Sequence, residues 1–111
     1  AARQARENAT INGIRQLRVV ERQVDATVGQ SDLKPDVIVL DPPRAGCGAK
    51  TAERLSKLNA ERIVYVSCNP STFAREAAIL SKNRYPLRQL TLIDQFPNTY
   101  HVETVALFSR G

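Results

Sequence analysis

Apolar residues follow two different spacings along the chain, and these divide it into alternating helices and strands. Runs of β-branched and aromatic residues predict strands, whereas apolar residues three or four positions apart predict helices. The pattern predicts strands at 17–24, 37–40, 62–66, 87–93 and 101–109, and helices at 1–12, 52–58 and 70–82. Strands that alternate with helices are typical of a parallel sheet, but the loop between the last two strands is too short to join parallel neighbours. The sequence therefore predicts an α/β domain with a mostly parallel sheet that ends in an antiparallel strand pair.

Local turn signals sharpen the boundaries of these elements. Asn69 followed by Pro70 predicts the start of helix 70–82, because Asn is a favourable N-cap and Pro suits the first helical position. The segment 41–46 (Asp-Pro-Pro-Arg-Ala-Gly) predicts a stiff loop, since each proline fixes φ and lacks an N–H donor. The continuous apolar run 37–40 before that loop is typical of a parallel strand buried on both faces.

Composition narrows the class of protein. The 111 residues suit one domain, and 42% apolar residues are enough for a folded core. No apolar stretch is long enough to span a membrane, and residues 1–7 lack the apolar core of a signal peptide. We therefore expect a soluble, cytoplasmic protein without a membrane partner.

Charge and cysteine content add weaker constraints. Lys and Arg number 16 against 11 Asp and Glu, and the net charge of +5 suits an RNA- or DNA-binding protein, although many other enzymes are equally basic. Cys47 and Cys68 are expected to be reduced rather than paired in a disulfide, since nothing else suggests secretion. His101 is the only histidine, and no segment has the spacing of metal ligands, so no metal site is predicted.

Cys68 holds the most informative position in the sequence. It follows the predicted strand 62–66 and precedes the predicted helix 70–82, which puts it at the carboxyl edge of the sheet. Ligands bind at this edge in open α/β sheets, and the N–H groups of a helix N-terminus favour the reactive thiolate form of a cysteine. The alternative is a small buried apolar side chain, the common role of cysteine.

Two carboxylates are candidates for the same site. Asp41 ends strand 37–40 at the same sheet edge, although it could instead cap the backbone of its own loop. On strand 101–109, Glu103 alternates onto one face with Val105 and Leu107, a face expected to be buried. A carboxylate among buried apolar residues is either paired or adapted to proton transfer. The alternative is that Glu103 is still solvated at the start of the strand.

A thiol and a carboxylate at one site suit methylation of uracil at C5. This carbon is too weak a nucleophile to attack a methyl donor until a thiolate adds to C6 and forms an enolate. A general base must then remove the C5 proton so that the thiolate can leave. Cys68 and Glu103 are residues of the types that these two steps require.

Three segments of the chain resemble the signatures of S-adenosylmethionine-dependent RNA uracil-5-methyltransferases. They are 41–46, then Ile-Val-Tyr-Val-Ser-Cys-Asn-Pro-Ser-Thr at 63–72, and Leu-Thr-Leu-Ile-Asp-Gln-Phe-Pro-Asn-Thr-Tyr-His-Val-Glu at 90–103. The resemblance spans essentially the whole chain. It implies a Rossmann-like class I methyltransferase fold, of which residues 1–111 form the C-terminal part of the catalytic domain.

The resemblance also assigns roles to individual residues. Cys68 is implied to be the nucleophile that attacks C6, and Glu103 the base that takes the C5 proton. Asp41 corresponds to an acidic residue at the pocket for S-adenosylmethionine. Gln23 falls where the family has a polar residue near the adenosine of that cofactor.

The implied substrate is RNA, with a uridine of 23S ribosomal RNA expected first and transfer RNA as the nearest alternative. The Gly-rich cofactor loop and the N-terminal RNA-binding or iron–sulfur modules of the family are not found in these residues. We therefore expect the chain to bind S-adenosylmethionine poorly and to be inactive by itself. Two other functions stay open: a Cys-dependent hydrolase that pairs Cys68 with His101, and a non-catalytic RNA-contacting fragment.

Overall fold

The computed structural model describes residues 2–13, 16, 33–94 and 102–111. Its elements, in chain order, are α1 (Ala2–Ile11), β1 (Val37–Leu40), α3 (Ala49–Lys57), β2 (Arg62–Ser67), α4 (Pro70–Lys82), β3 (Leu87–Asp94) and β4 (Val102–Ser109). Each corresponds to a predicted element, and α4 has the predicted bounds. The predicted strand 17–24, with Gln23, and the candidate base His101 lie outside the described residues. None of the described helices is long and apolar enough to cross a membrane.

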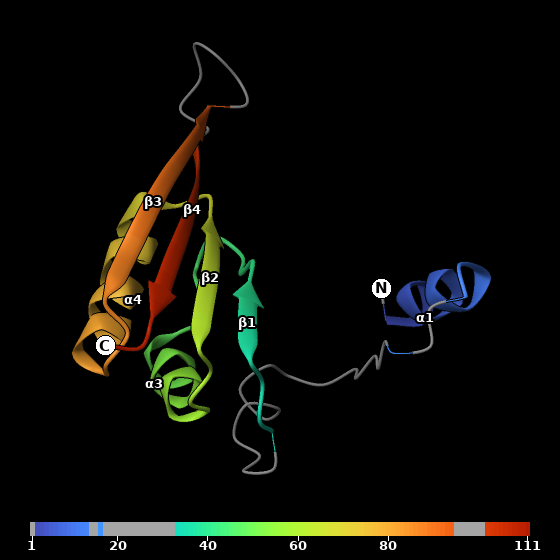
Figure 1. Ribbon diagram of the computed structural model, residues 1–111. Helices are drawn as coiled ribbons and strands as arrows, with labels where there is room; N and C mark the ends of the chain where they lie inside the picture. The colour runs from blue at the N-terminus through green and yellow to red at the C-terminus, as the bar shows by residue number, and fades with distance from the viewer. Residues whose placement is uncertain (1, 14–15, 17–32, 95–101) are drawn as a thin grey trace.

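The described strands form one sheet in the order β1-β2-β4-β3 (Figure 1). β1 and β2 pair in parallel, whereas β4 pairs antiparallel with both β2 and β3. It follows that β1, β2 and β3 run in one direction and that β4 runs in the opposite direction between two of them. The prediction of an antiparallel strand pair at the end of the sheet is confirmed. The prediction that the other strands share one direction is confirmed as well for the described strands.

The core lies between the sheet and α4. On β2 and β4 the side chains of Ile63, Tyr65, Ala106 and Phe108 are all at most 1% exposed, and from α4 Phe73 and Leu80 pack against them. The rings of Tyr65 and Phe73 meet edge to face, with centroids 5.4 Å apart, a geometry that aromatic pairs favour. Figure 1 shows α3 and α4 on the same side of the sheet. One face of β2 and β4 is therefore the buried face.

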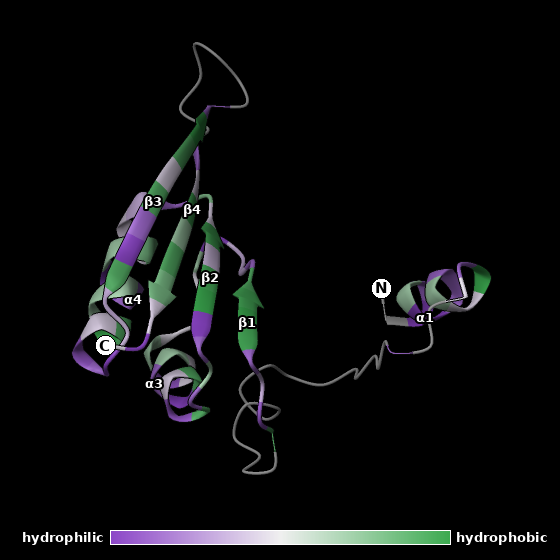
Figure 2. Ribbon diagram, viewed as in Figure 1, coloured by the Kyte–Doolittle hydropathy of each residue, from purple (hydrophilic) through white to green (hydrophobic). Residues whose placement is uncertain are grey.

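The expectation that the run 37–40 is buried on both faces is wrong. Val37 is 48% exposed and Val39 is 68% exposed, whereas Ile38 and Leu40 are partly buried against the core. The reason is that α3 and α4 cover only the face that carries Ile38 and Leu40. Figure 2 shows β1 in the green of hydrophobic residues.

The packing of α4 leads to a test of where the stability of the fold lies. Leu80 is fully buried, so Leu80→Ala should lower the free energy of unfolding by about 2–5 kcal/mol through lost burial and a residual cavity. Lys82, two residues further along the same helix, is exposed. Lys82→Ala should therefore change the free energy of unfolding by less than about 0.5 kcal/mol. Urea unfolding of both variants measures the difference, and equal values would contradict this account of the core.

Candidate active site

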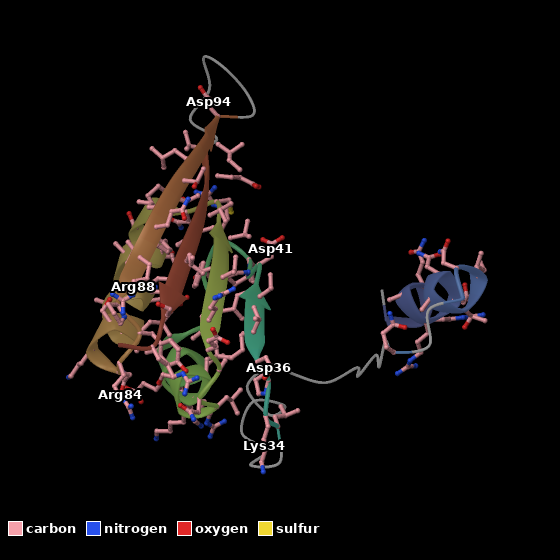
Figure 3. The ribbon with its side chains drawn as sticks, in the orientation of Figure 1. Lys34, Asp36, Asp41, Arg84, Arg88 and Asp94 are labelled. Carbon is pink, nitrogen blue, oxygen red and sulfur yellow. The ribbon has the colours of Figure 1, made fainter. Side chains whose placement is uncertain are left out.

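The carboxyl ends of β1 and β2 bring Asp41 and Cys68 to the same edge of the sheet. The two strands are parallel, and their last paired residues are Leu40 and Tyr65. Asp41 follows Leu40 directly and is exposed, and Figure 3 shows it at the opposite end of β1 from Asp36. Cys68 follows the end of β2 and is partly buried. The structure thus brings these two predicted site residues to one edge.

Glu103 reaches this edge through the pairing of β2 with β4. The last pair of that antiparallel ladder is Ser67 with Thr104, so the next positions along the two strands are Cys68 and Glu103. Ser67 and Thr104 are both 5% exposed and belong to the buried face. Because side chains alternate along a strand, Glu103 belongs to the opposite face. Three residues that are distant in the sequence therefore meet at one sheet edge.

The surroundings of Glu103 differ from the sequence-based expectation. The face that it shares with Val105 and Leu107 is the one that α3 and α4 leave uncovered, and all three side chains are only partly buried. The fully buried positions of β4 are those of Thr104, Ala106 and Phe108 instead. The prediction that Glu103 lies on a buried apolar face is wrong, because the helices pack on the other side of the sheet.

The turn that carries Cys68 is held by hydrogen bonds on both sides. Before it, the Ser67 hydroxyl accepts from the backbone N–H of Asn69 and donates to the Asn69 carbonyl, both over 3.1 Å. After it, the Asn69 side chain accepts from the N–H groups of Ser71 and Thr72 at 3.2 and 3.5 Å, with Pro70 in the first turn of α4. The predicted N-cap is confirmed. It fixes the backbone on which Cys68 stands.

The loop after β1 is tied to this same turn. The carbonyl oxygen of Arg44 accepts a hydrogen bond from the Asn69 amide at 3.0 Å and another from the Thr72 hydroxyl at 2.9 Å. Asn69 thus caps α4 with its side-chain oxygen and holds the neighbouring loop with its nitrogen. The segments that follow β1 and β2 are connected by direct hydrogen bonds.

A buried carboxylate on α4, Glu76, is part of the site and was not predicted from the sequence. It is 1% exposed, and it accepts hydrogen bonds from the backbone N–H groups of Cys47 at 3.1 Å and Gly48 at 2.9 Å. The Tyr65 hydroxyl and the Cys47 thiol also donate to it, the thiol over 3.3 Å. A sequence signal does exist, since Glu76 lies three residues after Phe73 and four before Leu80 on the apolar stripe of the helix. A charge on such a stripe must find partners.

These contacts set the protonation states of the cluster. Burial raises the pKa of Glu76, but the hydrogen bonds from Tyr65, Gly48 and Cys47 outweigh it and lower the pKa below its ordinary value of 4.5. Burial, followed by the hydrogen bond to Glu76 and its charge, raises the pKa of the Cys47 thiol to about 12. The same three causes raise the pKa of Tyr65. Near neutral pH, Glu76 is therefore charged and the Cys47 thiol is protonated.

The two cysteines, both free thiols, thus differ in their surroundings. Cys47 donates to a buried carboxylate that disfavours its thiolate, whereas Cys68 stands just before the N-terminus of α4. Among the residues that the structure describes, no group of three or more His, Cys, Asp or Glu side chains could hold a metal ion. The reactive groups that the structure describes at this edge are a thiol and carboxylates.

Alkylation should distinguish the two thiols. The rise in the pKa of Cys47 from 9.0 to about 12 reduces its thiolate population about a thousandfold relative to an ordinary thiol. At mildly alkaline pH, the Cys68→Ser variant, which retains only Cys47, should therefore react far more slowly with iodoacetamide than free cysteine does. The matched variant is Cys47→Ser, which retains only Cys68 and should react faster. Mass spectrometry measures both rates, and equal rates would contradict the assigned environments.

Comparison with known proteins gives this arrangement a family. The sequence profile of the tRNA (uracil-5-)-methyltransferase family matches residues 2–111. The chain is 45% identical over 113 residues to an uncharacterized RNA methyltransferase of Staphylococcus epidermidis, covering 99% of this chain and 25% of the relative. It is 38% identical over 107 residues to another from Caldanaerobacter subterraneus, covering 96% of this chain and 24% of the relative. The chain thus spans about a quarter of the length of these relatives.

Solved structures agree with the sequence comparison. The tRNA (uracil-54, C5)-methyltransferase of Pyrococcus abyssi, in complex with S-adenosyl-L-homocysteine, superposes with a TM-score of 0.76 at 36% identity. The match covers 96% of this chain and 26% of that protein. M1.HpyAVI superposes with a TM-score of 0.58 at 19% identity over 79% of this chain and 50% of that one, and this likeness concerns the fold alone. The predicted methyltransferase fold is confirmed, and the chain belongs to the tRNA (uracil-5-)-methyltransferase family.

Proposed function

We propose that this chain is part of an enzyme that methylates C5 of a uridine in RNA, with Cys68 as nucleophile and Glu103 as general base. The observation that carries the proposal is the register of β2 and β4, in which Cys68 and Glu103 take the next positions beyond the last pair. Family membership supports the same reaction. A thiol and a carboxylate on neighbouring strand ends suit a planar base that is attacked at one carbon and deprotonated at the next.

Cys68 begins the reaction. Its thiolate forms a bond from Sγ to C6 of uracil, and the electron pair of the C5–C6 double bond moves toward C5 and O4. C5 of the resulting enolate is the nucleophile that takes the methyl group. The hydrogen bonds of Ser67 and Asn69 on either side of Cys68 hold its backbone in place for this attack.

Glu103 completes the reaction. After methyl transfer, C5 carries both the new methyl group and its original proton. The carboxylate takes this proton, the C5–C6 double bond forms again, and the bond from Sγ to C6 breaks. Glu103 lies on the face of β4 that the described helices leave uncovered, so a base extruded from RNA has access to it.

The methyl donor proposed for this chain is S-adenosylmethionine, which supplies an electrophilic methyl group when bound. The exposed carboxylate of Asp41 suits one end of its site, because it stands at the carboxyl edge of the sheet and can accept hydrogen bonds from ligand amino or hydroxyl groups. Gln23 is a second proposed contact and lies outside the described residues. The Pyrococcus abyssi relative holds S-adenosyl-L-homocysteine, which supports this choice of cofactor.

The RNA substrate has two candidates. A uridine of 23S ribosomal RNA is the one expected first from the family resemblance, although the motifs themselves do not discriminate between the two RNAs. Transfer RNA is the second, and the specific observation in its favour is that both the family description and the Pyrococcus abyssi enzyme name it. Methylation assays of the intact enzyme on both RNAs, side by side, distinguish them.

Replacing the nucleophile should abolish methylation but not RNA binding. A serine hydroxyl is almost never ionised at neutral pH, so Cys68→Ser in the intact enzyme should lower the rate by about a thousandfold or more. Transfer of a labelled methyl group to RNA measures the rate. The control is Cys47→Ser, which keeps a hydroxyl donor toward Glu76 and should stay within about tenfold of the unmodified enzyme. Activity of Cys68→Ser within a few-fold of normal would exclude the assignment.

Replacing the base should stall the reaction one step later. Thiolate attack and methyl transfer precede proton removal, so Glu103→Gln should accumulate a covalent adduct between the enzyme and methylated RNA. Denaturing electrophoresis should show a retarded protein–RNA band. The double variant Cys68→Ser, Glu103→Gln is the control and should show none. Normal turnover by Glu103→Gln would mean that another group removes the proton.

A further inference from the structure

The loop between β1 and α3 needs support from outside itself. Residues 41–48 contain no helix or strand, and Asp41, Arg44 and Ala45 are exposed. One hydrogen bond inside the loop joins the N–H of Gly46 to the carbonyl of Pro43 at 2.8 Å. Pro42 and Pro43 have no N–H to add. The conformation of the loop therefore depends on contacts with other elements.

One face of α4 supplies these contacts. Asn69, Thr72 and Glu76 are spaced three and four residues apart, so they line up from the cap along the first two turns. Asn69 and Thr72 hold the carbonyl of Arg44 at the start of the segment 44–48. Glu76 holds the N–H groups of Cys47 and Gly48 at its end. Both ends of the segment are fixed to the same helix.

Close packing makes this attachment specific. Gly46 has a φ of +82°, which favours glycine, and a Cβ there would overlap the carboxylate of Glu76 and the methyl group of Thr72. The loop backbone thus lies directly against the helix. The position of the loop is therefore coupled to the side chain at position 76.

In its charged form the carboxylate at position 76 stabilises the fold, because its hydrogen bonds lower its pKa below the ordinary value. The four described donors to Glu76 are two backbone N–H groups, a phenol and a thiol, all of them neutral. Removing a charge from water is costly, and the hydrogen bonds offset that cost only while the donors are held in place around the carboxylate. What the carboxylate accomplishes here is to orient two adjacent N–H groups of the loop.

We propose that Glu76 is a positioning residue that locks the segment 44–48 against α4 and thereby holds Asp41, which two prolines connect to that segment, in place for cofactor binding. The inference rests on the proposed function for the role of Asp41. The cap of α4 fixes both the turn of Cys68 and the start of the segment 44–48, whereas Glu76 in the second turn fixes only the end of that segment. Loosening the second turn should therefore weaken cofactor binding while the turn of Cys68 stays in place.

The chain offers a matched pair of variants. Tyr65 and Tyr85 are both 1% exposed, and each donates one buried hydrogen bond from its hydroxyl. Tyr65 donates to Glu76, whereas Tyr85 donates to the carbonyl of Ala60 over 2.6 Å, before the amino end of β2. Tyr65→Phe and Tyr85→Phe each remove one buried hydroxyl, but only the first touches Glu76.

The experiment measures loop order and cofactor affinity separately in the intact enzyme. Hydrogen–deuterium exchange of the peptide that contains Cys47 and Gly48 should be at least about tenfold faster in Glu76→Gln. Calorimetry should show at least about tenfold weaker binding of S-adenosylmethionine by the same variant, because a misplaced contact cannot engage the ligand. Tyr65→Phe, and Thr72→Val at the other end of the segment, should shift both quantities in the same direction by at least about threefold. Tyr85→Phe should leave both unchanged.

Each outcome has a defined meaning. Unchanged hydrogen exchange in Glu76→Gln would overturn the inference, and so would faster exchange with unchanged cofactor affinity. The inference would also fail if Tyr85→Phe changed both quantities as much as Tyr65→Phe does. If Glu76→Gln does not fold, Tyr65→Phe and Thr72→Val decide by the same criteria. Neither measurement uses Cys68 or Glu103, so a failure of the proposed methylation chemistry, seen in the Cys68→Ser assay, is distinguishable from a failure of this inference.

Discussion

The packing of α4 against β2 and β4 is the interaction on which the described structure depends. Phe73 and Leu80 fix the helix on the sheet by burying apolar surface between Tyr65 and Phe108. With the helix fixed, its N-terminal cap stands directly after Cys68, and its second turn reaches the loop after β1. Core and candidate site therefore share one helix, and its packing on the sheet orders both.

The reversed direction of β4 has a consequence for the chemistry. A strand parallel to β2 would bring its carboxyl end, not its beginning, to the edge where Cys68 lies. Because β4 is antiparallel and lies between β2 and β3, its first residues reach that edge instead, and Glu103 is among them. The insertion of one reversed strand thus brings a base from near the end of the chain to a nucleophile thirty-five positions earlier.

The site also shows how one fold places two cysteines in different surroundings. Cys47 donates its thiol proton to Glu76, and burial together with this carboxylate stabilises the protonated form. Cys68 lies on the turn directly before α4, between the hydrogen-bonded residues Ser67 and Asn69. Side-chain type alone carries no such distinction. The burial of Cys47 and its neighbouring carboxylate create it.

The sequence by itself determined the order of the described helices and strands, the bounds of β1 and α4, the cap at Asn69, and the place of Cys68 and Asp41 at strand ends. These features depend on local spacing and local turn chemistry, which a single segment contains in full. Tertiary structure decided which side of each strand is buried: Val39 and Glu103 lie on the face that the described helices leave uncovered, and Glu76 lies beneath the loop. Burial depends on where another layer packs, and no segment encodes that alone.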